Sequence, residues 1–183
     1  IDGDVQVGGR MRLALVKHGS FAGTLDAQHI ERAVYATPDG LVQPLTVTGD
    51  LDYLRVVFGP IAAAVSAANG RIGEVRAMQG STVAGTIVAG TGFDYLYSEA
   101  TVRGSVTVLS GHFKKMVVSN SAGVAIATTI LVQSGDFRKL VARGSVENSL
   151  LLAASGAFGP AVVTASFVDS SLIGRTLDEV RVK

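Results

Sequence analysis

The chain has 183 residues, of which 48% are hydrophobic and 17% are charged, which excludes disorder and leaves enough apolar material for one domain. Its 16 lysines and arginines nearly balance 15 aspartates and glutamates, giving a formal charge of +1, so we expect no nucleic-acid partner. No apolar run is long enough for a membrane helix, so we expect no membrane insertion, and the lack of cysteine excludes disulfides and thiolate metal sites. The chain starts at Ile1 without a signal peptide, and we expect it to be part of a longer chain.

A repeat with an average period of about 21 residues runs through the chain. The clearest copies, which begin at residues 49, 70, 111 and 135, share a glycine, then a large apolar residue, two polar residues, a second apolar residue and a small apolar residue; the other copies are weaker. In chain order the copies begin at residues 9, 28, 49, 70, 91, 111, 135, 156 and 175. A second half-motif with Gly-Ser-Val character follows, most clearly at 80–89 and 144–153, and the stretch 28–48 departs most from the pattern.

Short strands and glycine turns fill each repeat. Apolar residues alternate over short stretches, as at Val146, Leu150 and Leu152, which is the spacing of a strand and not of a helix. A period near 21 built from strands and turns alone predicts an all-β fold, a single-stranded, right-handed parallel β-helix (β-solenoid) of about nine coils. The prediction covers residues 1–183 as one continuous segment, and the rod would be roughly 40 Å long. The alternative, a sandwich of irregular hairpins, gives no reason for a constant period.

Equivalent inward positions of the coils should stack into three apolar ladders. The first ladder is Met11, Ile30, Leu51, Ile72, Phe93, Phe113, Phe137, Phe158 and Leu177. The second is Ala14, Ala33, Leu54, Val75, Leu96, Met116, Leu140, Ala161 and Val180. The third is Val16, Tyr35, Val56, Ala77, Ser98, Val118, Ala142, Val163 and Val182. Corner glycines would supply the positive φ of sharp turns, and the uncapped ends suggest that the stack continues, in the same chain or into another molecule.

Signatures of catalysis or metal binding are nearly absent from the sequence. The three histidines, His18, His29 and His112, do not share one offset in the repeat, so they should not stack into a metal site. Two Asp-x-Asp pairs, at 2–4 and 50–52, could hold Ca²⁺ through carboxylate oxygens, but the calcium-binding nonapeptide of other solenoids is missing. We interpret these carboxylates as solvated turn residues and expect no cofactor.

The outward positions of the first strand carry the best candidate for a binding surface. Stacking would bring four cations together, close to Arg143, where they could dock an acidic glycan or a carboxylate-bearing partner. The four cations are Lys114, Lys115, Arg138 and Lys139. Tyrosines of the same face could stack against sugar rings, namely Tyr53, Tyr95 and Tyr97. The simpler interpretation is a solvated face that keeps the rod soluble.

Two outward contacts follow from the same stacking. Arg12 should lie beside Glu31, and Arg32 should lie beside Tyr53. Polysaccharide lyases and hydrolases also use parallel β-helices, with clustered carboxylates and cations on one outward sheet. The candidates for such a site here are Asp52, Glu74, Asp94, Arg55 and Arg76. The chain has few loops with which to wall a cleft, and we expect it not to be an enzyme.

The consensus Gly-x-[Ile/Phe]-x-x-[Val/Leu]-x-[Val/Ala], followed by Gly-Ser-Val, resembles repeats in very large secreted proteins of planctomycetes and related bacteria. Residues 70–90, 135–154 and 167–182 carry the pattern best. The resemblance implies an extracellular β-helical stalk, adhesin or surface-layer segment, and the pattern contains no catalytic residue. A fainter similarity to bactofilins implies a cytoplasmic β-helix that polymerises end to end.

These observations predict a structural segment of a bacterial cell-surface or extracellular protein. Its partners would be further copies of itself, end to end or laterally, with a surface glycan as a second candidate. The low charge density favours lateral contact, because a fully solvated rod is normally more polar. The alternatives are a polysaccharide-binding or polysaccharide-degrading β-helix and a cytoplasmic, bactofilin-like polymer.

Overall fold

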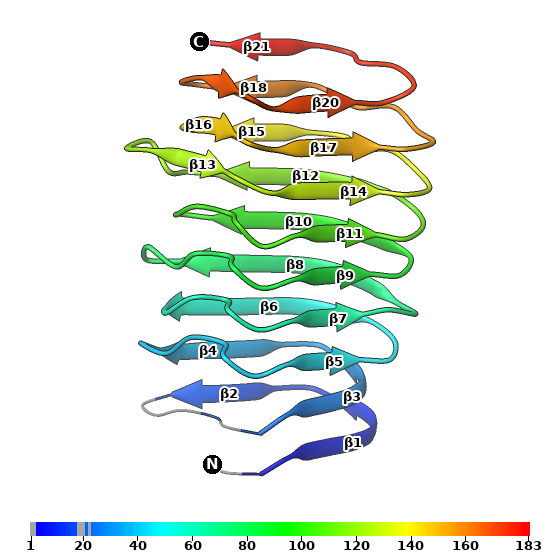
Figure 1. The fold of residues 1–183 in the computed structure, drawn as a ribbon. Helices are drawn as coiled ribbons and strands as arrows, with labels where there is room; N and C mark the ends of the chain where they lie inside the picture. The colour runs from blue at the N-terminus through cyan, green and yellow to red at the C-terminus, as the bar shows by residue number, and fades with distance from the viewer. Residues whose placement is uncertain (1–2, 18–20, 22) are drawn as a thin grey trace.

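The computed structural model describes residues 3–17, 21 and 23–183. In these residues the chain forms strands and turns without a helix, and it winds into one stack of coils with its termini at opposite ends (Figure 1). Strands pair in parallel with the equivalent segment of the next coil, as when Leu54 pairs with Val75. The predicted parallel β-solenoid is therefore confirmed. Nine ladder residues leave eight intervals, so the nine copies of the repeat make about eight turns.

Each coil has three faces. The long-strand face contains β2 (Ala14–Lys17), β4 (Ala33–Thr37), β6 (Leu51–Phe58), β8 (Arg71–Met78), β10 (Gly92–Ser98), β12 (Phe113–Val118), β15 (Leu140–Ala142), β18 (Ala161–Val163) and β21 (Val180–Val182). The short-strand face contains β1 (Val5–Met11), β3 (Leu25–Ile30), β5 (Leu45–Val47), β7 (Val65–Ala67), β9 (Ile87–Ala89), β11 (Val106–Val108), β14 (Thr129–Val132), β17 (Leu150–Ala153) and β20 (Ser171–Ile173). The third face, which we call the bridge face, contains β13 (Val124–Ile126), β16 (Ser145–Glu147), β19 (Phe167–Val168) and isolated bridges in other coils.

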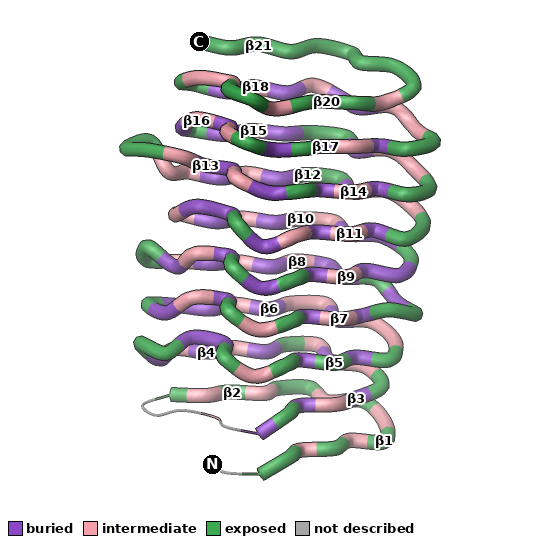
Figure 2. Tube along the Cα trace, viewed as in Figure 1, coloured by how far each residue is buried: buried purple, intermediate pink, exposed green. Residues whose placement is uncertain are grey.

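All three predicted ladders are present in the predicted register. The first runs by successive pairings from Met11 to Leu177, and the other two run in parallel along the long strands. The stretch 28–48, which departs most from the repeat, keeps the register, because Ala33 and Tyr35 take their expected places. Most ladder residues are buried along the interior of the stack (Figure 2).

Four phenylalanines form a continuous column in the first ladder. Phe93 and Phe113 are stacked with ring centroids 4.7 Å apart and planes 2° apart. The next pair, Phe113 and Phe137, is edge-to-face at 4.8 Å, and Phe137 stacks on Phe158 at 4.6 Å. All four side chains are fully buried. The column therefore combines burial of large apolar area with favourable ring geometry, and it makes this part of the core intolerant of polar groups.

The other two faces contribute ladders of their own, which the sequence analysis did not specify. The bridge face stacks Leu41, Ile61, Val83, Val102, Ile126, Val146 and Phe167. The short-strand face stacks Leu25, Leu45, Val65, Ile87, Val106, Ile130, Leu151 and Leu172. Side chains from three faces thus converge on one narrow interior.

The strand spacing predicted at Val146, Leu150 and Leu152 is confirmed by β16 and β17, but the three residues do not share one face. Val146 and Leu151 are buried, whereas Leu150 is 36% exposed and Leu152 is half-buried. Between them Asn148 adopts a left-handed φ of 47°, which turns the corner and shifts the phase of the alternation by one residue. The inward residue of β17 is therefore Leu151.

Close approach between coils, more than positive φ, explains the corner glycines. Gly111 and Gly135 do have the expected positive φ, of 77° and 129°. Gly70 and Gly156 do not, yet a β-carbon on either would overlap a backbone carbonyl oxygen of the coil below. The prediction about φ therefore holds at some corners only, and glycine is required at the others because the backbones of adjacent coils touch.

Tyr35 supplies a titration test of the third ladder. Its side chain is only 2% exposed, and burial raises its pKa to about 12. Because the folded-state pKa lies above the usual value of 10, the stabilisation from neutral Tyr35 is complete below pH 10 and is lost as the pH rises through about 12. We expect an alkaline absorbance titration to show one tyrosine ionising near pH 12 and this step to be missing in Tyr35→Phe. Identical titration curves for the two proteins would contradict the placement of Tyr35.

Both terminal coils leave the ladders uncovered. At the C-terminal end Leu177, Val180 and Val182 are 50%, 45% and 52% exposed, and the last coil is exposed along its length (Figure 2). At the N-terminal end Met11, Ala14 and Val16 line an apolar depression of about 200 Å³. Strand edges at the two ends of such a stack also carry unpaired backbone groups. Each terminal coil therefore presents the same apolar register as an interior coil.

Candidate binding surface

The long-strand face places tyrosines and cations side by side on successive coils. Tyr95 on β10 pairs in register with Lys115 on β12. Lys139 lies one coil further on, since the next residues, Met116 and Leu140, are paired. Side chains alternate along each strand, so these three point outward because Leu96, Met116 and Leu140 point inward. The repeat thus aligns three outward side chains parallel to the rod axis, about 4.8 Å apart.

A depression of about 380 Å³ on this face, which we call the Tyr–Lys depression, collects these side chains. It is lined by Tyr95, Tyr97, Lys115, Val117, Ser119, Lys139, Val141 and Arg143. Tyr97, Val117 and Val141 share one outward offset and form its apolar floor. The depression therefore has an apolar base, two phenol groups and three cations.

The cations of the depression lack protein counter-charges. Within residues 3–17, 21 and 23–183, no ion pair forms at Lys115, Lys139 or Arg143, and all three are exposed. Lys114 behaves differently, because its Nζ lies 2.9 Å from Asp94 Oδ1. The structure therefore brings only two of the four predicted cations into the depression. Lys115 and Lys139 line it, while Lys114 and Arg138 lie outside it.

The two tyrosines form an aromatic pair at the edge of the depression. Tyr95 and Tyr97 have ring centroids 6.4 Å apart with planes 26° apart. Lys115 Nζ lies 5.3 Å from the Tyr95 centroid, and the Arg76 guanidinium lies 5.8 Å from it. Burial raises the pKa of Tyr95, and Arg76 opposes this shift while Glu74 and Tyr97 add to it. Tyr95 therefore stays a neutral phenol at physiological pH and can donate a hydrogen bond.

Tyr53 is not part of the depression. It lies two coils below Tyr95, with Glu74 between them, and the Arg32 guanidinium is 5.6 Å from its ring centroid. The expected contact between Arg32 and Tyr53 is therefore confirmed.

The predicted register at Arg12 and Glu31 is present, because the residues that precede them, Met11 and Ile30, are paired. The ion pair of Glu31, however, is with Arg10 on the same strand as Met11.

The carboxylates of the alternative catalytic site contact different side chains. Asp52 Oδ2 lies 3.0 Å from His29 Nε2, and Glu74 forms an ion pair with Arg76. Asp94 is held between Arg71 at 3.1 Å and Lys114 at 2.9 Å. These side chains are distributed over successive coils.

The possible Ca²⁺ and histidine sites can be assessed only in part, because Asp2 and His18 lie outside the described residues. Asp50 Oδ1 accepts a hydrogen bond from the Arg71 backbone N–H at 2.7 Å. His112 and Asp136 form a separate contact at 3.2 Å. In the described part of the chain, no group of three or more His, Cys, Asp or Glu residues could hold a metal ion.

No family model, curated protein or solved structure matches this chain. In the described residues, no helix is long and apolar enough to cross a membrane. The fold and the surface define the class of the molecule: a parallel β-solenoid with three internal apolar ladder sets and one tyrosine- and lysine-lined depression on its long-strand face.

Proposed function

We propose that this chain is a structural segment of a bacterial cell-surface or extracellular protein, and that it spaces or assembles larger structures as a rod. One observation carries the proposal. Three apolar ladders, which include Met11, Ala14 and Val16 at one end and Leu177, Val180 and Val182 at the other, continue into both terminal coils, and the residues that end them at the C-terminal end are about half exposed. A terminal coil can therefore accept a further coil, from a second copy or from more repeats of a longer chain.

The driving force for such stacking is burial of apolar side chains, which also stabilises the interior of the rod. Leu177, Val180 and Val182 would be covered by Met11, Ala14 and Val16 of the next rod, restoring three ladders at once. Unpaired strand edges would gain backbone hydrogen bonds in the same step. Because both contributions depend on register, the contact favours straight, axial growth over random aggregation.

Charges at the C-terminal ends of two ladders should block this association. We expect the double variant Val180→Lys, Val182→Lys to remain monomeric in analytical ultracentrifugation at concentrations where the parent forms larger species, since each lysine would have to be buried unpaired. The fold itself should survive, because both side chains are about half exposed already.

A matched control carries two lysines away from the ends: Val42→Lys with Leu109→Lys, at positions that are 43% and 37% exposed. This control should associate like the parent. A parent that stays monomeric at every concentration, or end variants that associate as well as the control, would contradict axial stacking.

The cell-surface location is supported by the resemblance of the repeat to those of large secreted bacterial proteins. A bactofilin-like cytoplasmic polymer is the alternative, and it shares the same stacking mechanism. Cell fractionation of the natural host with an antibody against this chain separates the two, because the proposal requires the antigen in the envelope or the medium.

A further inference from the structure

The Tyr–Lys depression carries charge that nothing else in the described structure neutralises. On the coil below, the nearest carboxylate at the start of the strand, Asp94, is already shared by Arg71 and Lys114. Glu99, which follows that strand, accepts hydrogen bonds from the Gln79 backbone N–H and, at 3.5 Å, from the Tyr97 hydroxyl at the edge of the depression, but it forms no ion pair with Lys115, Lys139 or Arg143 in the described residues. The coil above offers no charge, since its outward residues are Gly159, Pro160, Val162 and Thr164. Within the described residues, Lys115, Lys139 and Arg143 therefore have no carboxylate partner, and Lys115 contacts only the Tyr95 ring, at 5.3 Å from its centroid.

We propose that this depression binds an acidic polysaccharide, a chain of sugar rings bearing carboxylate or sulfate groups. Lys115 and Lys139 lie on adjacent coils about 4.8 Å apart along the axis, and Arg143 lies at the other end of β15, about 13 Å from Lys139 along the strand. Such an array suits a ligand whose negative charges repeat along its length. The arginine can hold an acidic group through two parallel hydrogen bonds, and the lysines act as point charges.

The apolar part of the depression favours a sugar ring over another anion. Tyr95 and Tyr97 present aromatic surface with a hydroxyl at the edge, which matches a ring that has an apolar C–H face and polar substituents. Val117 and Val141 in the floor are half-buried, so they offer apolar surface to a ring lying on them. Ligand sites commonly combine such an apolar base with a few convergent polar groups.

An acidic peptide is the competing ligand, and the geometry of the coils disfavours it. Peptides that bind sheets usually add a strand to a free edge. Here β10, β12 and β15 are each paired on both sides, so a peptide would have to bind through its side chains alone. The proposal does not depend on axial stacking, because the depression lies on the side of the rod, away from both terminal coils.

The experiment measures the binding of the whole chain to three immobilised polymers by biolayer interferometry. Polygalacturonate supplies sugar rings with carboxylates, polyglutamate supplies carboxylates without rings, and dextran supplies rings without charge. We expect polygalacturonate to bind best and its affinity to fall with salt. The triple variant Lys115→Gln, Lys139→Gln, Arg143→Gln should lose about tenfold in affinity, since exposed charged contacts each contribute a few-fold.

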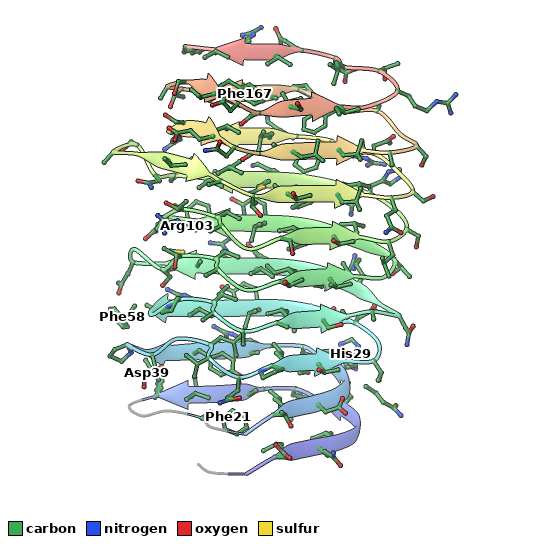
Figure 3. The ribbon with its side chains drawn as sticks, viewed as in Figure 1. Phe21, His29, Asp39, Phe58, Arg103 and Phe167 are labelled. Carbon is green, nitrogen blue, oxygen red and sulfur yellow. The ribbon has the colours of Figure 1, made fainter. Side chains whose placement is uncertain are left out.

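The matched control removes three exposed cations elsewhere, with Lys17→Gln, Arg103→Gln and Arg175→Gln (Arg103 is labelled in Figure 3). It has the same net charge as the first variant, so it should lose much less affinity if the depression is the site. Tyr97→Leu should weaken binding to polygalacturonate and leave the weaker binding to polyglutamate unchanged. Equal losses in the two triple variants would overturn the proposal in favour of diffuse charge attraction. Equal affinity of the parent for polyglutamate, or no binding to either polyanion, would also overturn it.

Discussion

Replacement of Phe137 by aspartate is expected to abolish cooperative folding of the rod. Phe137 is fully buried between Phe113 at 4.8 Å and Phe158 at 4.6 Å, counting ring centroids. A carboxylate there would lie in an apolar column with no cation or hydrogen-bond donor to pair with, at a cost of several kcal/mol in the free energy of unfolding. Because every coil rests on its neighbours, a defect in a middle coil separates the stack into two shorter pieces.

Circular dichroism during thermal unfolding measures this effect, and Arg138→Asp is the control. Arg138 is the next residue along the chain, is exposed, and points away from the core. Its replacement by the same carboxylate should change stability by no more than about 0.5 kcal/mol. An unchanged melting curve for Phe137→Asp would mean that the inward register of the first ladder is wrong.

Addition of a single methyl group at Gly135 is expected to destabilise the rod almost as strongly. The φ of 129° at this residue is open to glycine and strained for alanine. A β-carbon there would also overlap the carbonyl oxygen of Gly111 in the coil below, so relief would require the two coils to move apart. Together, backbone strain and overlap should cost about 3 kcal/mol or more, which would lower the melting temperature markedly.

The control for this substitution is Gly123→Ala. Gly123 lies in the neighbouring turn, its φ is not positive, and a β-carbon there would approach only the end of the Asn120 side chain, at 4.0 Å. We expect Gly123→Ala to be neutral or slightly stabilising, because alanine restricts the unfolded chain. Equal melting temperatures for the two alanine variants would contradict the close contact between coils at the glycine corners.

The stacking register could be predicted from the sequence because a solenoid converts spacing along the chain directly into neighbours in space. Phe113 and Phe137 are 24 residues apart, and Ile30 and Leu51 are 21 apart, yet both pairs stack, since the extra residues of the longer coil lie in its turn. The repeat pattern alone identifies these partners. Which residues of β17 point inward is less direct, because the left-handed Asn148 changes the phase of the alternation between Val146 and Leu150.

The candidate surface could be predicted only in outline. The repeat correctly predicts that Lys115 lies beside Lys139. It does not predict which cations form ion pairs, because that depends on how far each side chain extends; Lys114, for example, extends to Asp94 in the coil below. The register likewise places Arg12 beside Glu31, but the ion pair of Glu31 is with Arg10, which the repeat pattern does not reveal. Turn residues outside the ladders were equally hard to place; Phe58, for example, is exposed with a φ of 78° at the edge of the long-strand face (Figure 3).

Electron microscopy of the purified chain at a series of rising concentrations tests the central claim most directly. The account predicts particles roughly 40 Å long that join end to end into straight rods, with lengths that increase with concentration. It also predicts that the Val180→Lys, Val182→Lys variant keeps the short particles. Single short particles of the parent at every concentration would contradict the account, as would clumps without a common axis, because the uncovered ladders would then not direct assembly.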